Sequence, residues 1–421
     1  MREIRTEVLV VGAGPVGLCT ALLLAEAGLE TVIIDREQRT AARSYACALH
    51  PASLELLDRL GVAPALLDLG RRIPKVGFYE GTARRAELDF SRCGGRFPFL
   101  LLLPQSELES ALEQRLRQTG TAVTWNCRFA DVTKEGEDEL LAQLEELGGT
   151  STGYIVPHWE LTVKNRLACR TQFVVGADGV HSLVRERAGI GLVHGAGVER
   201  FAAYEFLSDQ AGEDEIRVVL EGQTTNVLWP LPERRFRWTF QLTQGELAAE
   251  FPEKERRAVR VAHLAVDERI RQHVQRLAAK RAPWFQATVK EIAWCTEVAF
   301  EHQVAREFGR DRCWLAGDAA HQTGPAGVQS TNAGFAEAET LVRHLRACLR
   351  DDAPLARLTA YSDQQVAAWR GLLGLAGGLK PRADTDAWVR DHAARLLPCL
   401  PATGAALAGL ANQLKLDLDP G

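Results

Sequence analysis

A glycine-rich turn near the start of the chain carries the first residues that could do chemistry. The segment VGAGPVG places Gly12, Gly14 and Gly17 in the G-x-G-x-x-G spacing, between an apolar run and a helical pattern. The first glycine permits a tight turn, the second lets backbone approach a pyrophosphate, and the third allows close helix–strand packing. The helix expected over 16–27 would offer free N–H groups to phosphate oxygens.

An acidic residue stands where the second strand of this unit should end. Residues 31–34 form an apolar run, and Asp35 follows it. Its carboxylate could accept hydrogen bonds from both ribose hydroxyls of an adenosine, and it disfavours a 2′-phosphate there. The glycine turn alone is a weak signal. Strand, turn, helix, strand and acid in this order nevertheless predict a site for FAD or NAD.

Two later segments place an aspartate beside a glycine after a short apolar run. Residues 174–185 read VVGADGVHSLVR, and residues 314–321 read WLAGDAAH. With the glycine turn, these motifs resemble, in order and spacing, those of the class A FAD-dependent aromatic monooxygenases related to para-hydroxybenzoate hydroxylase. The resemblance runs from Glu7 to about Arg370. It is weakest in the middle of the chain and in the tail.

The resemblance implies a set of FAD contacts. Asp318 would bind the ribityl hydroxyls, and Gly317 would let that strand end approach the cofactor. Asp178 would lie near the pyrophosphate and hold its own loop in place, although an aspartate between glycines is also a common turn residue. Three further polar side chains are implied around the cofactor, namely Arg36, Arg43 and Gln105.

The loop after the second aspartate departs from the family pattern. The family usually shows P-x-G-G-x-G-x-N, whereas residues 325–332 read PAGVQSTN. Pro325 and Gly327 are kept, but Val328 and Ser330 replace two glycines. Backbone N–H groups of the following helix would still stabilise negative charge on reduced flavin. This loop is expected beside the reactive face of the flavin, and no residue stands out as a base for the substrate.

Alternating apolar and polar residues in the middle of the chain predict antiparallel strands, among them 226–231 and 235–242. Trp229, Trp238 and Phe240 on these segments could line an aromatic substrate pocket. Alternating aromatic residues also fill the core of a sheet, and this is the favoured interpretation for each of the three singly.

The expected fold is α/β. A Rossmann-type, glutathione reductase-like FAD-binding domain would be interrupted by a mixed or antiparallel β-sheet substrate domain and followed by a helical C-terminal tail. The charged stretch 135–149 is expected to be a solvated excursion between strands. The expected domain boundaries are 1–75, 100–190 and 300–350 for the FAD-binding domain, 76–99 and 191–299 for the substrate domain, and 351–421 for the tail.

Bulk properties exclude several other classes of protein. The 421 residues have a net charge of −5, which argues against a nucleic-acid partner. The ten histidines show no metal-ligand spacing, and no apolar run is long enough to span a bilayer. Nine cysteines without a C-x-x-C pair indicate free thiols in a reducing cytoplasm. A monomer or a homodimer is expected.

The resemblance also implies an activity. NADH or NADPH would bind transiently and reduce the FAD, and a flavin C4a-hydroperoxide would then hydroxylate a small aromatic or polyketide-like substrate. The main alternative is an FAD-dependent reductase or dehydrogenase of the same fold that inserts no oxygen. A flavin-dependent halogenase is disfavoured because its W-x-W-x-I-P segment is missing. A non-enzymatic FAD-binding sensor or scaffold is a third alternative.

Overall fold

A six-stranded sheet forms the centre of the first half of the molecule. The computed structural model describes residues 2–39, 48–152, 158–195, 197–210, 212–244, 246 and 264–419. The sheet has the strand order β21-β22-β13-β2-β3-β9. All residues of β2 and β13 are buried, as expected for parallel strands covered on both faces. The strands are β2 (Val8–Val11), β3 (Thr31–Ile34), β9 (Val123–Thr124), β13 (Phe173–Gly176), β21 (Gly309–Arg310) and β22 (Cys313–Leu315).

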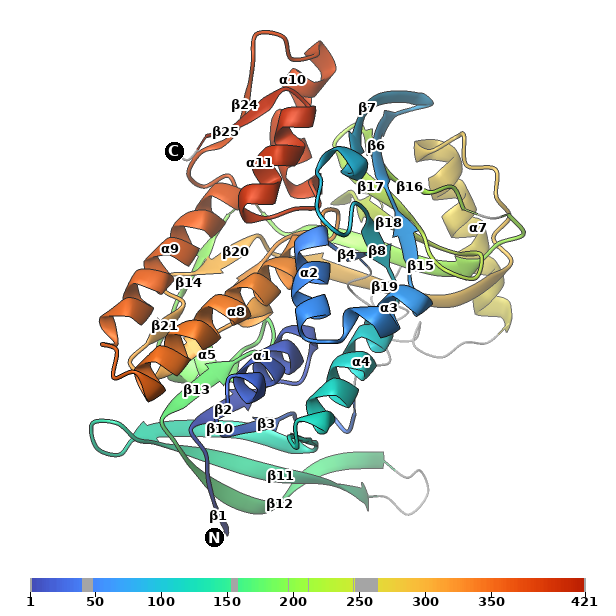
Figure 1. Cartoon of the computed structure of the whole chain (residues 1–421). Coiled ribbons are helices and arrows are strands. Elements are labelled where there is room, and N and C mark those ends of the chain that lie inside the picture. The colour runs from blue at the N-terminus through green and yellow to red at the C-terminus, as the bar shows by residue number, and fades with distance from the viewer. Residues whose placement is uncertain are drawn as a thin grey trace.

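Helices cover one face of this sheet, with α1 between α4 and α8 (Figure 1). Their bounds are α1 (Pro15–Glu26), α4 (Gln105–Gln118) and α8 (Gln329–Arg350). Most of α1 is buried, which explains why this helix is apolar around its whole circumference. The short helices α2 (Pro51–Arg59), α3 (Ala63–Leu69) and α5 (Leu183–Arg187) complete this part.

A four-stranded sheet of order β1-β12-β11-β10 lies across the other side (Figure 1). Its strands are β1 (Arg2–Arg5), β10 (Cys127–Lys134), β11 (Leu140–Thr152) and β12 (His158–Thr171). The prediction of a solvated excursion over 135–149 is therefore wrong for most of that stretch, which belongs to β11. Its leucines and alanine at 140, 142 and 144 are buried while Gln143 is exposed, so one face of the strand packs and the other meets water.

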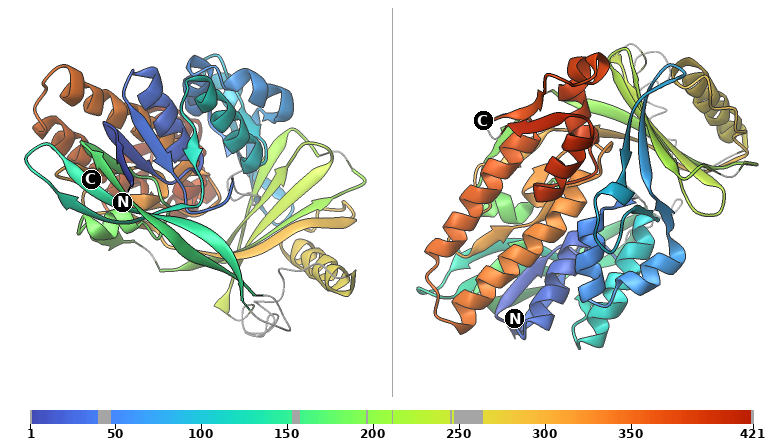
Figure 2. Two further views of the ribbon diagram at one scale, coloured as in Figure 1. Left: turned by 90° about the horizontal axis from the view of Figure 1, so that it is seen from below. Right: turned by 45° about the horizontal axis from the view of Figure 1, so that its top comes forward.

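A seven-stranded sheet of order β19-β15-β18-β17-β16-β6-β7 forms the second half. The β6–β16 pair is parallel and the other pairs are antiparallel, so the sheet is mixed. Helix α7 (Leu264–Arg281) packs on its outer face, away from α1 and α8 (Figure 2). The strands are β6 (Lys75–Glu80), β7 (Ala83–Asp89), β15 (Glu199–Leu207), β16 (Glu215–Glu221), β17 (Thr224–Pro230), β18 (Arg235–Leu242) and β19 (Glu291–Phe300).

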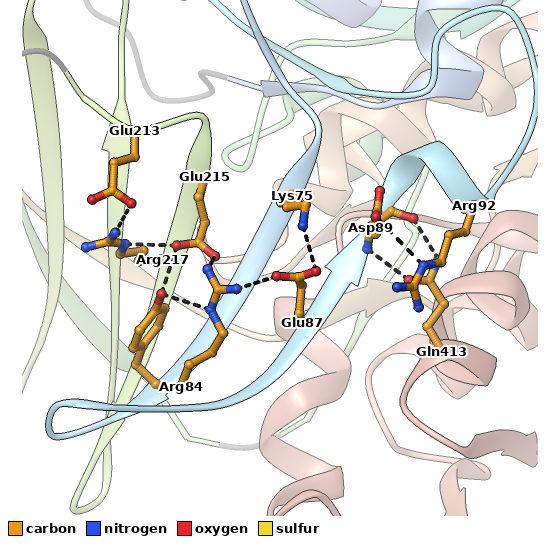
Figure 3. Close-up of polar contacts among 10 residues, drawn as sticks. Lys75, Arg84, Glu87, Asp89, Arg92, Glu213, Glu215, Arg217 and Gln413 are labelled. Carbon is orange, nitrogen blue, oxygen red and sulfur yellow. Dashed lines mark hydrogen bonds and ion pairs between the residues drawn. The ribbon is translucent and has the colours of Figure 1, made fainter.

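A buried carboxylate joins the hairpin of β6 and β7 to β16, a strand from a distant part of the chain (Figure 3). Glu215 accepts hydrogen bonds from Tyr79 Oη at 2.8 Å, from Arg217 Nε at 2.9 Å and from Arg84. Only 4% of its side chain is exposed, so these three donors replace the water that a buried carboxylate would otherwise need. The early hairpin is thereby fixed to the later strands of the same sheet.

The C-terminal part contains α9 (Ala356–Leu372), which packs on α8, and α10 (Ala387–Leu396) and α11 (Gly404–Gln413), which pack against the inner face of the seven-stranded sheet. It also contains an antiparallel pair, β24 (Gly378–Pro381) with β25 (Leu416–Asp419), which the expectation of a helical tail did not include. Within the described residues, no helix is both long enough and apolar enough to cross a membrane.

Candidate functional site

A cavity of about 1000 Å³ lies between the ends of the parallel strands and the seven-stranded sheet. Four segments from different parts of the chain form its walls. They are the glycine turn, the loop after β13, the loop before α8 and strand β19. In open α/β sheets, ligands bind at this carboxyl end of the strands.

The glycine turn combines tight packing behind with open space in front. An ideal Cβ on Gly12 would lie 2.3 Å from the Ala177 carbonyl oxygen, and one on Gly17 would lie 1.9 Å from the Gly12 carbonyl oxygen. A Cβ on Gly14 would meet nothing within 4 Å, and Gly14 lines the cavity. Helix α1 starts at Pro15, also on the cavity wall, without a side-chain cap. A phosphate fits this place, since backbone can approach it and free N–H groups face it.

Asp35 is turned toward the glycine turn. Its carboxylate accepts hydrogen bonds from the Ala13 backbone N–H at 2.6 Å and from the Glu37 backbone N–H at 2.8 Å. These contacts hold the turn and the end of β3 together. Arg36 is exposed and lines the cavity, 3.6 Å from Glu37 across an ion pair. Arg43 lies outside the described residues.

Asp178 holds its own loop in place. It accepts hydrogen bonds from the Ser182 hydroxyl, from the Leu183 N–H at 2.8 Å and from the Val184 N–H at 3.2 Å, so it satisfies the N-terminus of α5. Burial raises the pKa of this carboxyl, and the hydrogen bonds oppose that effect. The loop residues beside it, Ala177 and 179–181, line the cavity, whereas Asp178 itself stands behind them.

Asp318 opens onto the cavity. Desolvation by the surrounding protein raises the pKa of this carboxyl. The positive charge that His321 can carry lowers this pKa, and the negative charge of Glu337 raises it. Gly317 before it has φ +62°, and an ideal Cβ there would lie 3.0 Å from Val16, so the strand end packs directly on α1. A carboxylate at this point can accept hydrogen bonds from the hydroxyl groups of a ligand.

A buried polar cluster supports the strand end behind Asp318. His321 Nε2 lies 2.7 Å from Glu337 Oε2, and the Trp369 indole donates a 2.5 Å hydrogen bond to Glu337 Oε1. The imidazole stacks on the Trp369 indole, with ring centroids 3.7 Å apart. The His321 side chain has no exposed surface, so its position fits a structural role and not that of a base for the substrate.

The loop before α8 is fixed by the C-terminal part of the chain. The Gln329 amide donates to the carbonyl oxygens of Leu397 at 3.0 Å and Leu400 at 2.9 Å. An ideal Cβ on Gly327 would lie 2.7 Å from the Pro398 carbonyl oxygen. This contact explains why that glycine is kept. Pro325 and Val328 line the cavity, while Gly327 packs behind them.

Val328 has a left-handed backbone conformation, with φ 49° and ψ 41°. This conformation is rare for a β-branched residue, whose Cβ then crowds the following carbonyl. The Val328 side chain compensates by packing in the buried cluster that includes Ala326, Trp229 and Leu400. Its isopropyl group therefore belongs mainly to the core under the C-terminal segment.

A histidine that sequence reasoning missed holds the same loop from the other side. His50 Nε2 lies 2.9 Å from the Gly327 carbonyl oxygen, and the His50 backbone N–H donates to Asn332 Oδ1 at 2.8 Å. The Asn332 amide in turn donates to the carbonyl oxygens of Ala48 and Val328. Burial lowers the pKa of His50 to about 4, so the ring is neutral and Nε2–H donates.

The three aromatic residues expected in a substrate pocket lie in two cores. Trp238 and Phe240 are fully buried on the face of the sheet that packs against α7, with Val274 in the same cluster. Neither residue lines the cavity, so the expectation that they line a substrate pocket is corrected. Both fill the core of the sheet, which was the favoured alternative. Trp229 is buried on the opposite face, next to Ala326 of the loop before α8.

Gln105 is the first residue of α4 and lines the cavity. Its amide nitrogen donates to Glu109 Oε1 at 2.8 Å, which orients the side chain at the helix start. Strand β19 also lines this cavity, and no sequence pattern had singled it out. The lining residues are 292–300 of the strand and Glu301 directly after it.

Comparison with known proteins identifies the type of fold. A family model described as "FAD binding domain" matches residues 5–373. A 6-methylpretetramide 4-monooxygenase from Streptomyces rimosus is 31% identical over 366 residues, covering 86% of this chain and 59% of the relative. A pentachlorophenol 4-monooxygenase from Sphingobium chlorophenolicum is 27% identical over 371 residues, covering 87% of this chain and 63% of the relative. The chain thus spans about three fifths of the length of these relatives.

Solved structures share the architecture. The crystal structure of a p-nitrophenol 4-monooxygenase from Pseudomonas putida superposes with a TM-score of 0.72 at 21% identity, covering 99% of this chain and 95% of that one. A complex of aklavinone-11 hydroxylase with FAD and aklavinone gives a TM-score of 0.66 at 23% identity, covering 88% and 69%. At these identities, the likeness establishes the fold alone.

The buried His50 should make stability depend on pH. Between pH 6.5 and 4, His50 is protonated in the unfolded chain but stays neutral in the folded protein. The free energy of unfolding therefore falls as the pH falls. A shift from 6.5 to about 4 corresponds to about 3 kcal/mol. His50→Gln keeps an amide donor but cannot titrate. We expect its urea midpoint to fall less steeply over this window than that of wild type or of the exposed control His194→Gln. Parallel curves for all three proteins would contradict this account.

The left-handed Val328 should reverse the usual order of alanine and glycine. Both Val328→Ala and Val328→Gly lose the buried isopropyl group, but only glycine adopts φ 49° without strain. Urea unfolding should therefore show Val328→Gly to be more stable than Val328→Ala by about 1 kcal/mol. A more stable alanine variant would mean that the loop relaxes out of this conformation.

Proposed function

We propose that this chain, which belongs to the FAD-binding domain family, is an FAD-dependent monooxygenase. It uses NADH or NADPH and dioxygen to hydroxylate a small aromatic or polyketide-like substrate. The observation that carries the proposal is the single cavity that joins the open Gly14 turn, the Asp318 carboxylate and the start of α8 to strand β19. The activities named for the relatives support it, because they are monooxygenases of a polyketide and of a phenol.

Each wall of the cavity has a proposed role toward FAD. Backbone at Gly14 and the N-terminus of α1 hold the pyrophosphate, with Arg36 beside them. Asp318 accepts hydrogen bonds from the ribityl chain, and Gln105 contacts the flavin. Bound FAD supplies electron transfer and the activation of dioxygen.

The start of α8 places positive potential beside the proposed flavin position. Val328 caps this helix without a side-chain hydrogen bond, so the first backbone N–H groups remain available as donors. Together with the helix dipole, they stabilise negative charge on a reduced cofactor. Pro325 and the Gly327–Val328 turn hold this edge in a fixed position, because His50 and the C-terminal segment bind them from behind.

Strand β19 supplies the proposed substrate wall. Its cavity residues include Trp294, Val298 and Phe300 as apolar surface and Thr296 as a polar group. Such a wall suits a flat ring that carries hydroxyl or carbonyl groups, since apolar surface covers the ring and a few polar groups orient it. The wall also excludes water from the reacting atoms.

We assign the FAD-binding role to residues 1–75, 100–190 and 300–350, and the substrate-binding role to 76–99 and 191–299. The segment 351–421 then serves as a brace for the loop before α8. A reducing cytoplasmic location is proposed, since the nine cysteines include no C-x-x-C pair. We propose a monomer or a homodimer, without nucleic-acid partners, that binds its substrate, dioxygen and nicotinamide transiently.

Oxygen insertion separates this function from its main alternative. With 4-nitrophenol and a tetracyclic polyketide phenol as test substrates, we expect the purified yellow protein to consume oxygen with NADH or NADPH. The substrate should stimulate this consumption, and ¹⁸O from ¹⁸O₂ should appear in the product by mass spectrometry. Reduction of the substrate without oxygen uptake would identify a reductase or dehydrogenase instead. A protein that takes up no FAD would refute both.

Asp318 should control the retention of FAD. Asp318→Ala removes the carboxylate that opens onto the cavity, and we expect FAD affinity to fall at least about tenfold, the equivalent of one lost charge-assisted hydrogen bond. Asp363→Ala, on the exposed side of α9, is the matched control and should keep wild-type FAD content. Equal FAD content in both variants, measured by absorbance after gel filtration, would disprove the placement.

A further inference from the structure

Two charged side chains and two indoles form a row across the inner face of the seven-stranded sheet. Trp229 of β17 lies opposite Arg237 of β18. Glu205 of β15 lies opposite both Arg237 and Trp294 of β19. Residues directly opposite each other in a sheet share a face. Trp229 packs in the core beside the C-terminal segment, whereas Trp294 lines the cavity. One end of the row therefore belongs to the wall of the candidate site.

The two charged groups of this row form a buried ion pair. Arg237 Nη2 donates to Glu205 Oε2 at 2.7 Å, and only 3% and 9% of the two side chains are exposed. The guanidinium carbon also lies 5.3 Å from the centre of the Trp294 ring, within the range of a cation–π contact. The indole reaches across β15 to make this contact, because β15 separates β18 from β19. The ion pair thus orients an aromatic ring of the cavity wall.

A slot with a floor of small residues lies beside this indole. The next inward-facing row of the sheet contains Ala203, Thr239 and Thr296. Ala203 belongs to a strand with neighbours on both sides, yet part of its surface stays accessible, and Thr296 lines the cavity. Beyond this row, the Phe201 ring packs edge-on against the Phe300 ring with centroids 5.7 Å apart. Small side chains between aromatic ones therefore leave room for a flat ligand on the wall.

The wall formed by β19 is longer than a single aromatic ring. Its inward-facing side chains are Trp294, Thr296, Val298 and Phe300. Neighbouring ones are about 7 Å apart and the four span about 20 Å, because a strand rises about 3.3 Å per residue. The Phe300 end lies nearest Pro325, since Glu199 opposite Phe300 comes within 3.4 Å of an ideal Cβ on Gly324. A single phenol ring beside Pro325 therefore does not reach Trp294, whereas a molecule of several fused rings does.

We propose that Trp294, held by the Arg237–Glu205 pair, selects planar substrates of several fused rings. The reacting ring lies at the Pro325 end of the wall, and a remote ring stacks on the Trp294 indole beside the slot at Ala203. An indole that is already oriented loses little further rotamer freedom when a ring stacks on it, so more of the stacking free energy appears as affinity. This inference rests on the proposed function and narrows its substrate class to fused-ring aromatic compounds. Arg237 and Glu205 are positioning residues.

Two ligands with the same hydroxyl–carbonyl pair test this selection without turnover. 2-Hydroxyacetophenone carries the pair on a single ring, and 1-hydroxyanthraquinone carries it on a fused system. We would measure the Kd of each for the oxidised, FAD-loaded protein by equilibrium dialysis. Trp294→Ala should weaken binding of 1-hydroxyanthraquinone at least about tenfold, the scale of one lost aromatic partner, and change that of the smaller ligand less than about twofold. Trp294→Phe should recover most of the affinity.

Filling the slot is an independent test of where the remote ring lies. Ala203→Leu places a larger side chain on the floor of the slot, so the Kd of 1-hydroxyanthraquinone should rise at least about tenfold while that of 2-hydroxyacetophenone stays nearly constant. The matched control is Ala83→Leu, at an exposed position of the edge strand β7 in the same sheet, and it should bind both ligands as wild type does.

The positioning role of the ion pair is tested by removing both charges together, because one substitution would leave a buried charge unpaired. Arg237→Gln/Glu205→Gln should raise the Kd of 1-hydroxyanthraquinone about threefold, as expected for a lost cation–π contact, without changing that of 2-hydroxyacetophenone. The double variant Arg84→Gln/Glu215→Gln removes an ion pair of the same sheet away from the cavity, and it should match wild type.

The outcomes separate this inference from the function on which it rests. An unchanged Kd of 1-hydroxyanthraquinone in Trp294→Ala, or an equal loss for both ligands, would overturn the selection even if the protein hydroxylates them. A wild type that binds the fused-ring ligand no more tightly than the single-ring ligand would also overturn it. Fused-ring binding that depends on Trp294, without any oxygenated product in the presence of NADH or NADPH, would refute the monooxygenase function while supporting the selection.

Discussion

The close approach of the glycine turn to the loop after β13 is the constraint on which the whole site depends. Gly12 packs on the Ala177 carbonyl so tightly that no Cβ fits between them, and Gly17 packs equally tightly on Gly12. This contact aligns the ends of β2 and β13, and β22 joins them in register. The loops that carry Gly14 and Asp318 therefore face the same cavity because the backbone at Gly12 packs directly on the backbone at Ala177.

A second constraint acts on the loop before α8, which two distant parts of the chain and the first turn of α8 hold. His50 binds it from the N-terminal side, Asn332 from within α8, and the carbonyl groups of 397–400 from the C-terminal side through Gln329. The neutral state of His50 matters here, because a protonated ring would place an unpaired charge in a buried site. The same bracing tolerates Val328 in a left-handed conformation, since its buried side chain offsets part of the backbone strain.

Sequence patterns predicted the parts of this site that depend on local spacing. The glycine turn, the two aspartate motifs and the antiparallel strands around Trp229 all depend on residues close together in the chain. The orientation of Trp238 and Phe240 could not be predicted, because period-two alternation does not reveal which face of a sheet meets α7. The stretch that contains β11 was not predicted as a strand because its exposed face carries polar and charged residues. Only the opposite face of this strand is buried. The pair β24–β25 joins two short segments that are separated in the chain by α10 and α11, so no local hairpin pattern announces it.

Pairs that form across the fold leave no such pattern. Glu337 and Trp369 meet around His321 from two different helices. Glu199 at the start of β15 likewise meets His302, which follows β19 about a hundred residues later in the chain. The two histidines support different parts of the site. His321 is enclosed by stacked rings on a buried carboxylate, so any proton it exchanged would have to cross the core. The His302 ring turns its Cε1–Nε2 edge toward Gly324 of the cavity wall, and Nε2 is held by Glu199, so this pair supports the wall from behind.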